Sequence, residues 1–324
     1  MTGTAALSVL VDPLGAFGTG LFPPVVGADR DYKTTLYRQL SEPPHTVVIG
    51  SSRSKTLRPA CITAITGEPA FNFGVNGAVA EDYLAIFRWL RRDTHSALRT
   101  VLLGVDPEAF QESEAPHRPL EDSRMLRGLV PSSVRQNRWT AVAQDLWSTQ
   151  AFVAAFRSLR YAILGSPDLP STRLGADGVQ QYPRFEADAK TGRFPQAENV
   201  EQSIPGILPR YANFSRLSSR RLAILVTLAQ EARAAEVELV GFIPPVHPEL
   251  ERAAAGGDLP ARTRETADTL QGLERAGLLR YVETRELAAF GGDSTLFYDA
   301  LHFMPGNADR LISAVLGHHT CAVQ

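Results

Sequence analysis

Short runs of aliphatic and aromatic residues recur in the first part of the chain, and each of them ends at a glycine. Residues 46–50, 70–74 and 100–104 form such runs. A continuous apolar run bounded by turn residues is typical of a strand that is buried on both faces. Between the second and third runs, residues 81–91 place apolar side chains at helical spacing. This alternation of strands and helices predicts a parallel sheet covered by helices on both faces.

The same alternation returns near the end of the chain. Helix patterns and strand patterns follow one another there at residues 217–235, 237–243, 262–276, 279–282 and 307–316. The chain has no internal repeat and no low-complexity tract. We therefore expect one α/β domain over residues 1–324, with a three-layer α/β/α arrangement and a central parallel sheet.

Residues 111–211 interrupt this alternation. Trp139–Leu164 has helical patterning, whereas residues 165–209 are rich in glycine, proline and charge and have little periodicity. A segment of this length is too long for an ordinary loop. We predict a mid-chain, mainly helical insertion at residues 111–211 that forms part of the substrate cleft or a cap over it.

Composition and charge narrow the class of protein. Apolar residues make up 44% of the chain and charged residues 21%, which is typical of a folded globular protein. The 33 basic and 35 acidic residues leave a net charge of −2, so nucleic acid is not an expected partner. The sequence has neither a phosphate-binding loop nor a dinucleotide-binding motif, and its histidines and cysteines lack metal-ligand spacing. We therefore expect no cofactor and no metal.

Cysteine usage and the N-terminal segment bear on the compartment. Cys61 and Cys321 make no disulfide framework, and we interpret them as buried or unreactive thiols. No apolar run reaches the roughly 18 residues that a membrane span needs. Residues 1–11 are apolar but lack the positive start and the cleavage site of a signal peptide. We expect a soluble, by default cytoplasmic protein. The alternative is the cell envelope, with membrane association only through an anchor upstream of this sequence.

The first segment with candidate chemistry is residues 47–54, Val-Val-Ile-Gly-Ser-Ser-Arg-Ser. Its glycine and serines lie where a predicted strand ends, and ligands of parallel sheets bind outside the carboxyl ends of the strands. A hydroxyl such as that of Ser52 is exposed there, with the N-terminus of the next helix close by to meet negative charge. The alternative is a plain turn in which a serine caps the helix.

Two further segments carry candidate groups. In residues 71–78, Gly74 and Gly77 allow the backbone to approach a ligand and to point N–H groups toward it, although such residues also fill ordinary turns. Near the end of the chain, Asp299 and His302 lie three residues apart. This spacing can place the carboxylate against the imidazole, which fixes the tautomer and supports the imidazolium during proton transfer.

In this order, the motifs resemble those of the SGNH (GDSL-like) hydrolase superfamily, in its divergent bacterial branch with a Gly-Ser-Ser-Arg first block. The family's first block, G-D-S, is matched with Ser51 in place of the aspartate and Ser52 in the serine position. The glycine of the second block, an oxyanion donor in the family, is matched by Gly77. The last block, D-x-x-H, is matched by Asp299 and His302.

The third block departs from the family. Its pattern is G-x-N-D, with an asparagine that donates to the oxyanion, whereas residues 104–107 place Asp106 at that position. An ionised carboxylate cannot donate a hydrogen bond, and the loss of one such donor costs about 10²–10³-fold in rate. Either Asp106 is protonated, or it points elsewhere, or another donor such as Asn76 replaces it, or the protein is a poor esterase.

Other candidates have an ordinary structural interpretation beside the functional one. Arg53 and Lys55 flank the serine and either attract an anionic substrate or belong to a solvated loop. His247 follows a predicted strand and either contacts the substrate or is a structural loop histidine. Residues 292–295, Gly-Asp-Ser-Thr, spell the family's first block more closely. No strand runs into them, and we interpret them as a loop with a capping serine.

The resemblance implies an SGNH or flavodoxin-like fold and a serine esterase or deacylase acting on an O-acyl substrate, such as an acetylated carbohydrate. Ser52 would be the nucleophile, His302 the base and Asp299 the residue that orients the imidazole. The backbone N–H groups of Ser52 and Gly77 would form the oxyanion hole. The alternatives are a non-catalytic protein that binds a glycan or a partner on the same fold, and an O-acyltransferase.

Overall fold

The computed structural model describes residues 29–93, 96–112, 120, 123, 125–130, 172–317 and 321. Five parallel strands form the central sheet in the order β2-β1-β3-β6-β7. In that order they are Ala70–Asn72, Thr46–Ile49, Thr100–Gly104, Glu238–Phe242 and Arg280–Val282. Counted along the chain, this is the 2-1-3-4-5 order of doubly wound flavodoxin-like folds. The prediction of a central parallel sheet is confirmed.

The strand β1, which lies between β2 and β3, is buried along its whole length. Val47, Val48 and Ile49 have no exposed surface. Val47 pairs with Phe71 of β2 on one side and with Val101 of β3 on the other. Successive side chains of a strand point to opposite faces, and both faces of this sheet are covered. The strand is therefore apolar at every position rather than at alternate ones.

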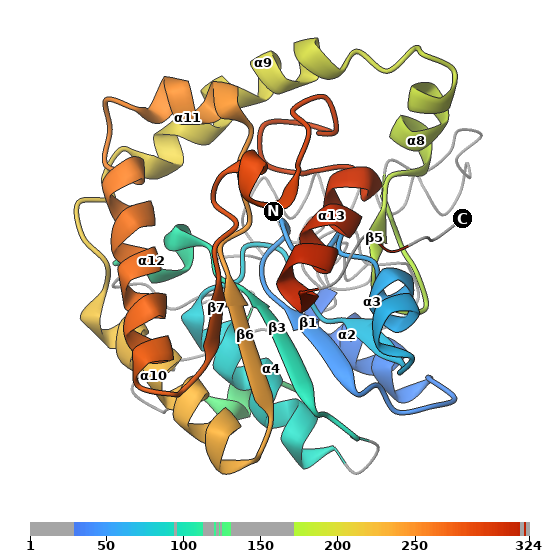
Figure 1. Cartoon of the computed structure of the whole chain (residues 1–324), viewed down its shortest axis with the longest axis vertical. Helices are drawn as coiled ribbons and strands as arrows, with labels where there is room; N and C mark the ends of the chain where they lie inside the picture. The colour runs from blue at the N-terminus through green and yellow to red at the C-terminus, as the bar shows by residue number, and fades with distance from the viewer. Residues whose placement is uncertain are drawn as a thin grey trace, which may run out of the picture.

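Helices cover both faces of the sheet (Figure 1). One face carries α3 and α13, which contact each other, and the opposite face carries α4 and α10, which also contact each other. The four helices are Pro59–Thr66, Pro305–Leu316, Ala80–Arg92 and Ser219–Ala234, in that order. A fifth helix, α12 (Leu259–Arg275), contacts the edge strand β7. The three-layer α/β/α prediction is confirmed.

Helices α2 and α11 are absent from the sequence-based prediction. α2 (Asp29–Arg38) buries Arg30 and Lys33 along with apolar side chains, so its inward face has no clear apolar periodicity. α11 (Pro248–Ala254) has only seven residues and is recognisable mainly by the proline at its start. Apolar spacing alone is a weak signal for a helix of either kind.

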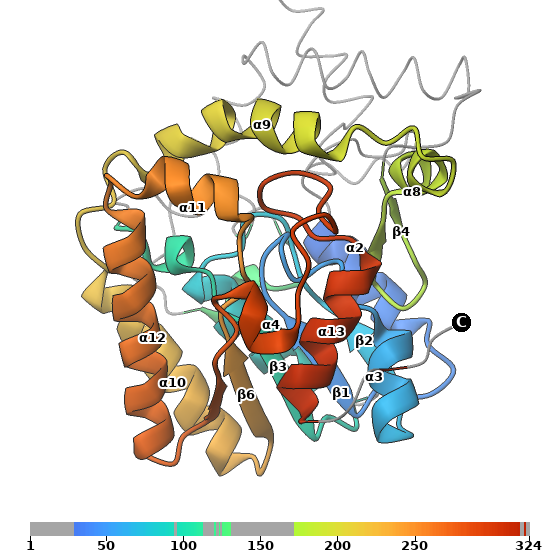
Figure 2. The same ribbon diagram turned by 45° about the horizontal axis from the view of Figure 1, so that its top comes forward.

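Between β3 and α10, the longest described stretch of the chain begins at residue 172. It forms a hairpin of β4 (Arg173–Leu174) and β5 (Gln180–Gln181), then α8 (Pro183–Lys190) and α9 (Gln196–Ile207). Figure 2 shows α9 lying across the end of the molecule where α11 also lies. The sequence predicted little periodicity in this segment. The structure gives the reason, because α8 buries no side chain completely and α9 buries only two. The helix predicted at residues 139–164 lies outside the described residues.

Short 3₁₀ turns complete the described secondary structure. They are η1 (Pro107–Phe110), η2 (Arg127–Leu129), η4 (Leu208–Tyr211) and η5 (Leu287–Phe290). η1 directly follows β3 and contacts α12 and α10. No helix among the described residues has the length and apolar character needed to cross a bilayer.

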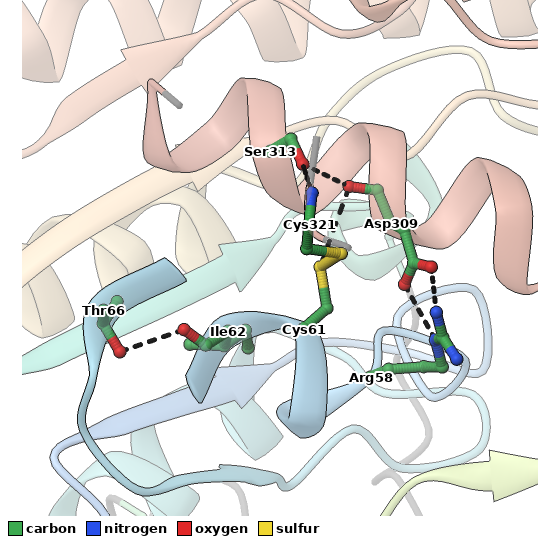
Figure 3. Close-up of a disulfide and its surroundings, with 7 residues drawn as sticks. All are labelled: Arg58, Cys61, Ile62, Thr66, Asp309, Ser313 and Cys321. Atoms are coloured by element: carbon green, nitrogen blue, oxygen red, sulfur yellow. Dashed lines mark hydrogen bonds and ion pairs between the residues drawn. A yellow bond between two sulfur atoms is a disulfide. The ribbon is translucent and has the colours of Figure 1, made fainter. Parts of the chain in front are cut away.

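A disulfide joins Cys61 of α3 to Cys321, which lies beyond the end of α13 (Figure 3). The two Cα atoms are 5.5 Å apart, although 260 residues separate them in the chain. The interpretation of these cysteines as unreactive thiols is therefore wrong. Beside the disulfide, Arg58 Nε lies 2.8 Å from Asp309 Oδ1, so an ion pair also links the two helices. Sequence spacing could not reveal the pairing, because only the packing of α3 on α13 brings the cysteines together.

Candidate functional site

A serine hydroxyl and a histidine ring from opposite ends of the described chain meet at the carboxyl end of the sheet. Ser52 follows β1, and its Oγ lies 2.9 Å from Nε2 of His302. Both residues are half-buried. A hydroxyl at this distance from an imidazole nitrogen can pass its proton to that ring.

The other nitrogen of the same ring faces Asp299. His302 Nδ1 lies 2.8 Å from Asp299 Oδ2 and 3.0 Å from Oδ1. Asp299 Oδ1 also accepts hydrogen bonds from the backbone N–H groups of Leu301 and His302, both at 2.8 Å. Burial raises the pKa of Asp299, but the bond with His302 and the amide donors outweigh it, so the pKa lies below its ordinary value. An ionised Asp299 keeps the proton of a neutral ring on Nδ1 and leaves Nε2 as the acceptor that faces Ser52.

The loop that carries Asp299 and His302 is fixed at several points. Phe297 and Phe303 form an antiparallel bridge that closes its base. At its tip, the N–H of Ala300 donates to Oγ of Ser203 on α9 at 3.0 Å. The Ala300 carbonyl accepts the N–H of His247, which follows β6, also at 3.0 Å. The loop is therefore held between the sheet and the mid-chain segment 111–211.

Gly77 and Asn76 lie on the chain that leaves β2, which continues alongside the chain that leaves β1 toward Ser52. The N–H of Val75 donates to the carbonyl of Gly50 at 2.9 Å, which extends the parallel register past the strand ends. Gly77 has a φ of +56°, a conformation that favours glycine. Among the described residues, none accepts a hydrogen bond from the N–H of Ser52 or of Gly77. Both amides are thus available to a ligand.

The Asn76 side chain is oriented by Lys55. Its Oδ1 lies 3.1 Å from Lys55 Nζ, and its backbone N–H donates to Asp29 Oδ2 at 2.7 Å. Lys55 is buried, and burial lowers its pKa below the ordinary value, although Asp29 opposes this shift. Lys55 is therefore not part of a solvated loop. With Oδ1 turned to Lys55, the amide nitrogen of Asn76 has no acceptor among the residues that the structure describes.

Arg53 is not solvated either, because only 4% of its surface is exposed. Its Nε lies 2.9 Å from Oδ1 of Asp106, the acid at the position where the resemblance expects an asparagine. The Asp106 side chain is thus directed at a buried cation. This matches the alternative in which Asp106 points elsewhere than at an oxyanion.

His247 has a structural environment. Its Nδ1 accepts the N–H of Glu249 at 3.1 Å, which caps the N-terminus of α11. Nε2 lies 3.1 Å from the carbonyl oxygen of Ser294 and donates to it, since Nδ1 is the acceptor. Burial lowers the pKa of the ring below its ordinary value. Both nitrogens are occupied by the protein, as in the structural interpretation.

Ser294 belongs to residues 292–295, which form a loop as predicted. We predicted that the serine of this loop is its capping residue, but the capping side chain is that of the aspartate. The side chain of Asp293 accepts the N–H of Thr295 at 2.8 Å, while Ser294 is exposed. The imidazole of His247 contacts only the backbone carbonyl of Ser294, and the Ser294 hydroxyl has no imidazole partner among the described residues.

Asn72, at the end of β2, is a residue that motif reasoning missed. Its Nδ2 donates to the carbonyls of Ser54 at 2.8 Å and Leu57 at 2.7 Å. Its Oδ1 accepts the N–H of Gly74 at 2.8 Å. A single buried amide thus ties the loop after Ser52 to the loop that leads to Gly77. The available signal was a polar residue within an apolar strand run.

A cavity of about 420 Å³ lies next to this region, between the end of β6 and helices α11 and α12. Its wall includes Arg53, Pro244, Leu259 and Arg285, but neither Ser52 nor His302. The Ser52–His302 pair therefore does not line this cavity. A group of three potential metal ligands occurs elsewhere among the described residues, formed by Cys61, Asp309 and Cys321, but its two sulfurs are joined in the disulfide.

No protein-family model and no curated protein sequence matches this chain. Among solved structures, the chain is similar to a protein from Bacteroides fragilis whose title reads "putative acylhydrolase". The superposition covers 88% of this chain and 92% of that chain, with 9% sequence identity and a TM-score of 0.41. A similarity of this degree supports no statement about activity.

Proposed function

We propose that this protein is a serine esterase or deacylase of the SGNH type that acts on an O-acyl substrate. One observation carries the proposal. Ser52 Oγ lies 2.9 Å from His302 Nε2, and His302 Nδ1 lies 2.8 Å from an Asp299 whose pKa is lowered. Acyl transfer through a serine uses a nucleophile that is hydrogen-bonded to a base, and the base is in turn oriented by a carboxylate.

In the proposed reaction, Ser52 Oγ attacks the acyl carbonyl while His302 Nε2 takes its proton. Asp299 stabilises the imidazolium that forms. The free N–H groups of Ser52 and Gly77 donate to the oxyanion, and the Asn76 amide is the third donor. His302 then gives the proton to the leaving alcohol, and a water activated by the same ring releases the acyl group from Ser52.

The proposed substrate carries a small acyl group on a carbohydrate, an inference that rests on the SGNH resemblance. The proposed place of action is an oxidising compartment such as the cell envelope, rather than the cytoplasm. The Cys61–Cys321 disulfide supports this, because disulfides persist in oxidising compartments and are rare where thiols are kept reduced.

A fluorophosphonate probe, which reacts with activated serines, tests the proposal on the full chain. We expect one labelled residue, Ser52, with labelling lost in Ser52→Ala and strongly reduced in His302→Ala. Ser294→Ala is the matched control, since its serine lies in the alternative G-D-S sequence and is exposed. Labelling of Ser294, or no labelling at any pH, would contradict the proposal and favour the non-catalytic binding protein.

A second experiment separates the hydrolase from the O-acyltransferase. The full chain is given p-nitrophenyl acetate with and without an added sugar acceptor. Free acetate as the product in both cases supports the hydrolase. Acetylated sugar formed at the expense of acetate would identify a transferase working through the same serine.

A further inference from the structure

Asp106 and Arg53 form a buried ion pair beside the proposed nucleophile. Asp106 follows β3 and is 3% exposed, and Arg53 is 4% exposed. Arg53 Nε lies 2.9 Å from Asp106 Oδ1. A guanidinium removed from water in this way needs a carboxylate partner, because an unpaired buried charge is strongly unfavourable.

The rest of the Arg53 guanidinium is also engaged. Nη1 lies 3.3 Å from Glu108 Oε1, and Nη2 donates to the carbonyl oxygen of Pro244. Glu108 Oε1 in turn accepts the hydroxyl of Tyr211 at 2.6 Å. Arg53 thereby connects the turn after β1 with the chain leaving β3, the chain leaving β6 and the turn η4.

The residue on the other side of Ser52 is tied to Arg53. Ser51 Oγ accepts the backbone N–H of Arg53 at 3.2 Å, and the Ser51 hydroxyl acts to lower the pKa of Asp106. The turn on both sides of Ser52 is therefore held at Arg53, the residue that pairs with Asp106. Ser52 itself is left free to face His302.

We propose that Asp106 is a positioning residue that holds the turn carrying Ser52 through Arg53, and that it does not bind the oxyanion. This inference rests on the proposed function for the meaning of Ser52. In the family pattern, the residue at this position donates to the reacting group. In this chain it acts one step further away, through Arg53, the residue that follows the nucleophile.

The charges around Asp106 fit this role. Burial raises the pKa of Asp106 to about 6, with Arg53 opposing the rise and Glu108 adding to it. His302, Tyr83 and Tyr211 also interact electrostatically with it. At neutral pH the carboxyl is ionised, and an ionised carboxyl accepts hydrogen bonds but cannot donate one to an oxyanion.

The test is Asp106→Asn, which has nearly the same shape and restores the family's residue. We expect the rate of fluorophosphonate labelling at Ser52 and the kcat for p-nitrophenyl acetate to fall about 100-fold, because the turn moves out of position, with KM little changed. Ser51→Ala removes the acceptor of the Arg53 N–H within the turn and should lower both rates without removing the ion pair. The matched control is Glu231→Gln, an acid-to-amide change in the Arg88–Glu231 pair of helices α4 and α10, which should leave both rates unchanged.

A second readout does not depend on activity. In crystal structures of Asp106→Asn and Ser51→Ala, we expect the distance from Ser52 Oγ to His302 Nε2 to exceed the hydrogen-bond limit of about 3.5 Å. An unchanged distance overturns the inference, and so does a labelling rate in Asp106→Asn that equals or exceeds that of the natural protein. If the natural protein resists the probe while the distance still lengthens in the variants, only the proposed esterase activity fails.

Discussion

Cys61 and Cys321 are joined by a disulfide that links the helix after the Ser52 turn to the segment after the helix that follows His302. The bridge therefore spans the two parts of the chain that meet in the candidate site. The ion pair between Arg58 and Asp309 connects the same two helices (Figure 3).

Loss of this bridge should destabilise the fold. We expect Cys61→Ser to lower the free energy of unfolding by about 2–5 kcal/mol, because the open chain regains the freedom of a very long loop. Denaturant unfolding, monitored by circular dichroism with and without dithiothreitol, measures the loss. The control is the double variant Cys61→Ser/Cys321→Ser, which should be insensitive to dithiothreitol. A natural protein whose stability is unaffected by reduction would contradict the prediction.

Ser203 should support the loop of Asp299 and His302. Ser203→Ala removes the acceptor of the Ala300 N–H, and an unpaired buried amide costs about 1–3 kcal/mol of stability. We expect a lower kcat for p-nitrophenyl acetate at unchanged KM, since the loop carries the base and not the substrate contacts. Ser203→Thr keeps an oxygen at the same position and should restore the rate. Equal kcat values in Ser203→Ala and the natural protein would show that α9 does not position the loop.

Asn76 should contribute to the rate through its side-chain amide. Asn76→Ala removes this donor, and we expect kcat/KM to fall by about 10²–10³-fold, the usual effect of losing an oxyanion donor. Steady-state hydrolysis of p-nitrophenyl acetate measures the change. Lys55→Met, which removes the partner of Oδ1 and an ion pair with Asp29 but keeps the amide, should have a smaller effect. A rate unaffected by Asn76→Ala would leave the two backbone amides as the whole oxyanion hole.

His247 should make stability depend on pH. Burial lowers the pKa of its ring in the folded state below the ordinary value of 6.5. Below that pH the unfolded ring takes up a proton that the folded ring does not, so stability falls as the pH falls. The free energy of unfolding at pH 7.5 and 5.5 measures this difference. In His247→Asn, which keeps a capping side chain without a titratable ring, the difference should be smaller.

The central strands and the main helices could be predicted because their signals are local. Residues 46–50 and 100–104 are apolar at successive positions because β1 and β3 are covered on both faces. Helix α2 escaped prediction because its buried positions include Arg30 and Lys33. These charges are satisfied by residues distant in sequence, Arg30 by Asp82 and Lys33 by the Asn72 carbonyl. A local sequence pattern cannot show which distant residue pairs with a buried charge.

Some features of the candidate site could likewise be predicted from the sequence, and others depended on the tertiary structure. Residue types, their order along the chain and the edge of the sheet at which strands end were sufficient to select Ser52, Asp299 and His302. The alternation of strands and helices predicts parallel strands, whose carboxyl ends share one edge. Their mutual distances depended on how the loops are held, by Asn72 on one side and by Ser203 on the other.

Folding alone decided which charged residues near the site face solvent and which are buried. Arg53 and Asp106 have the same sequence context whether they bind a substrate or each other, and the disulfide of Cys61 had no local signal. The physical reason is that apolar periodicity reports burial averaged over a face, whereas ion pairs, buried hydrogen bonds and disulfides depend on single distances between residues far apart in the chain.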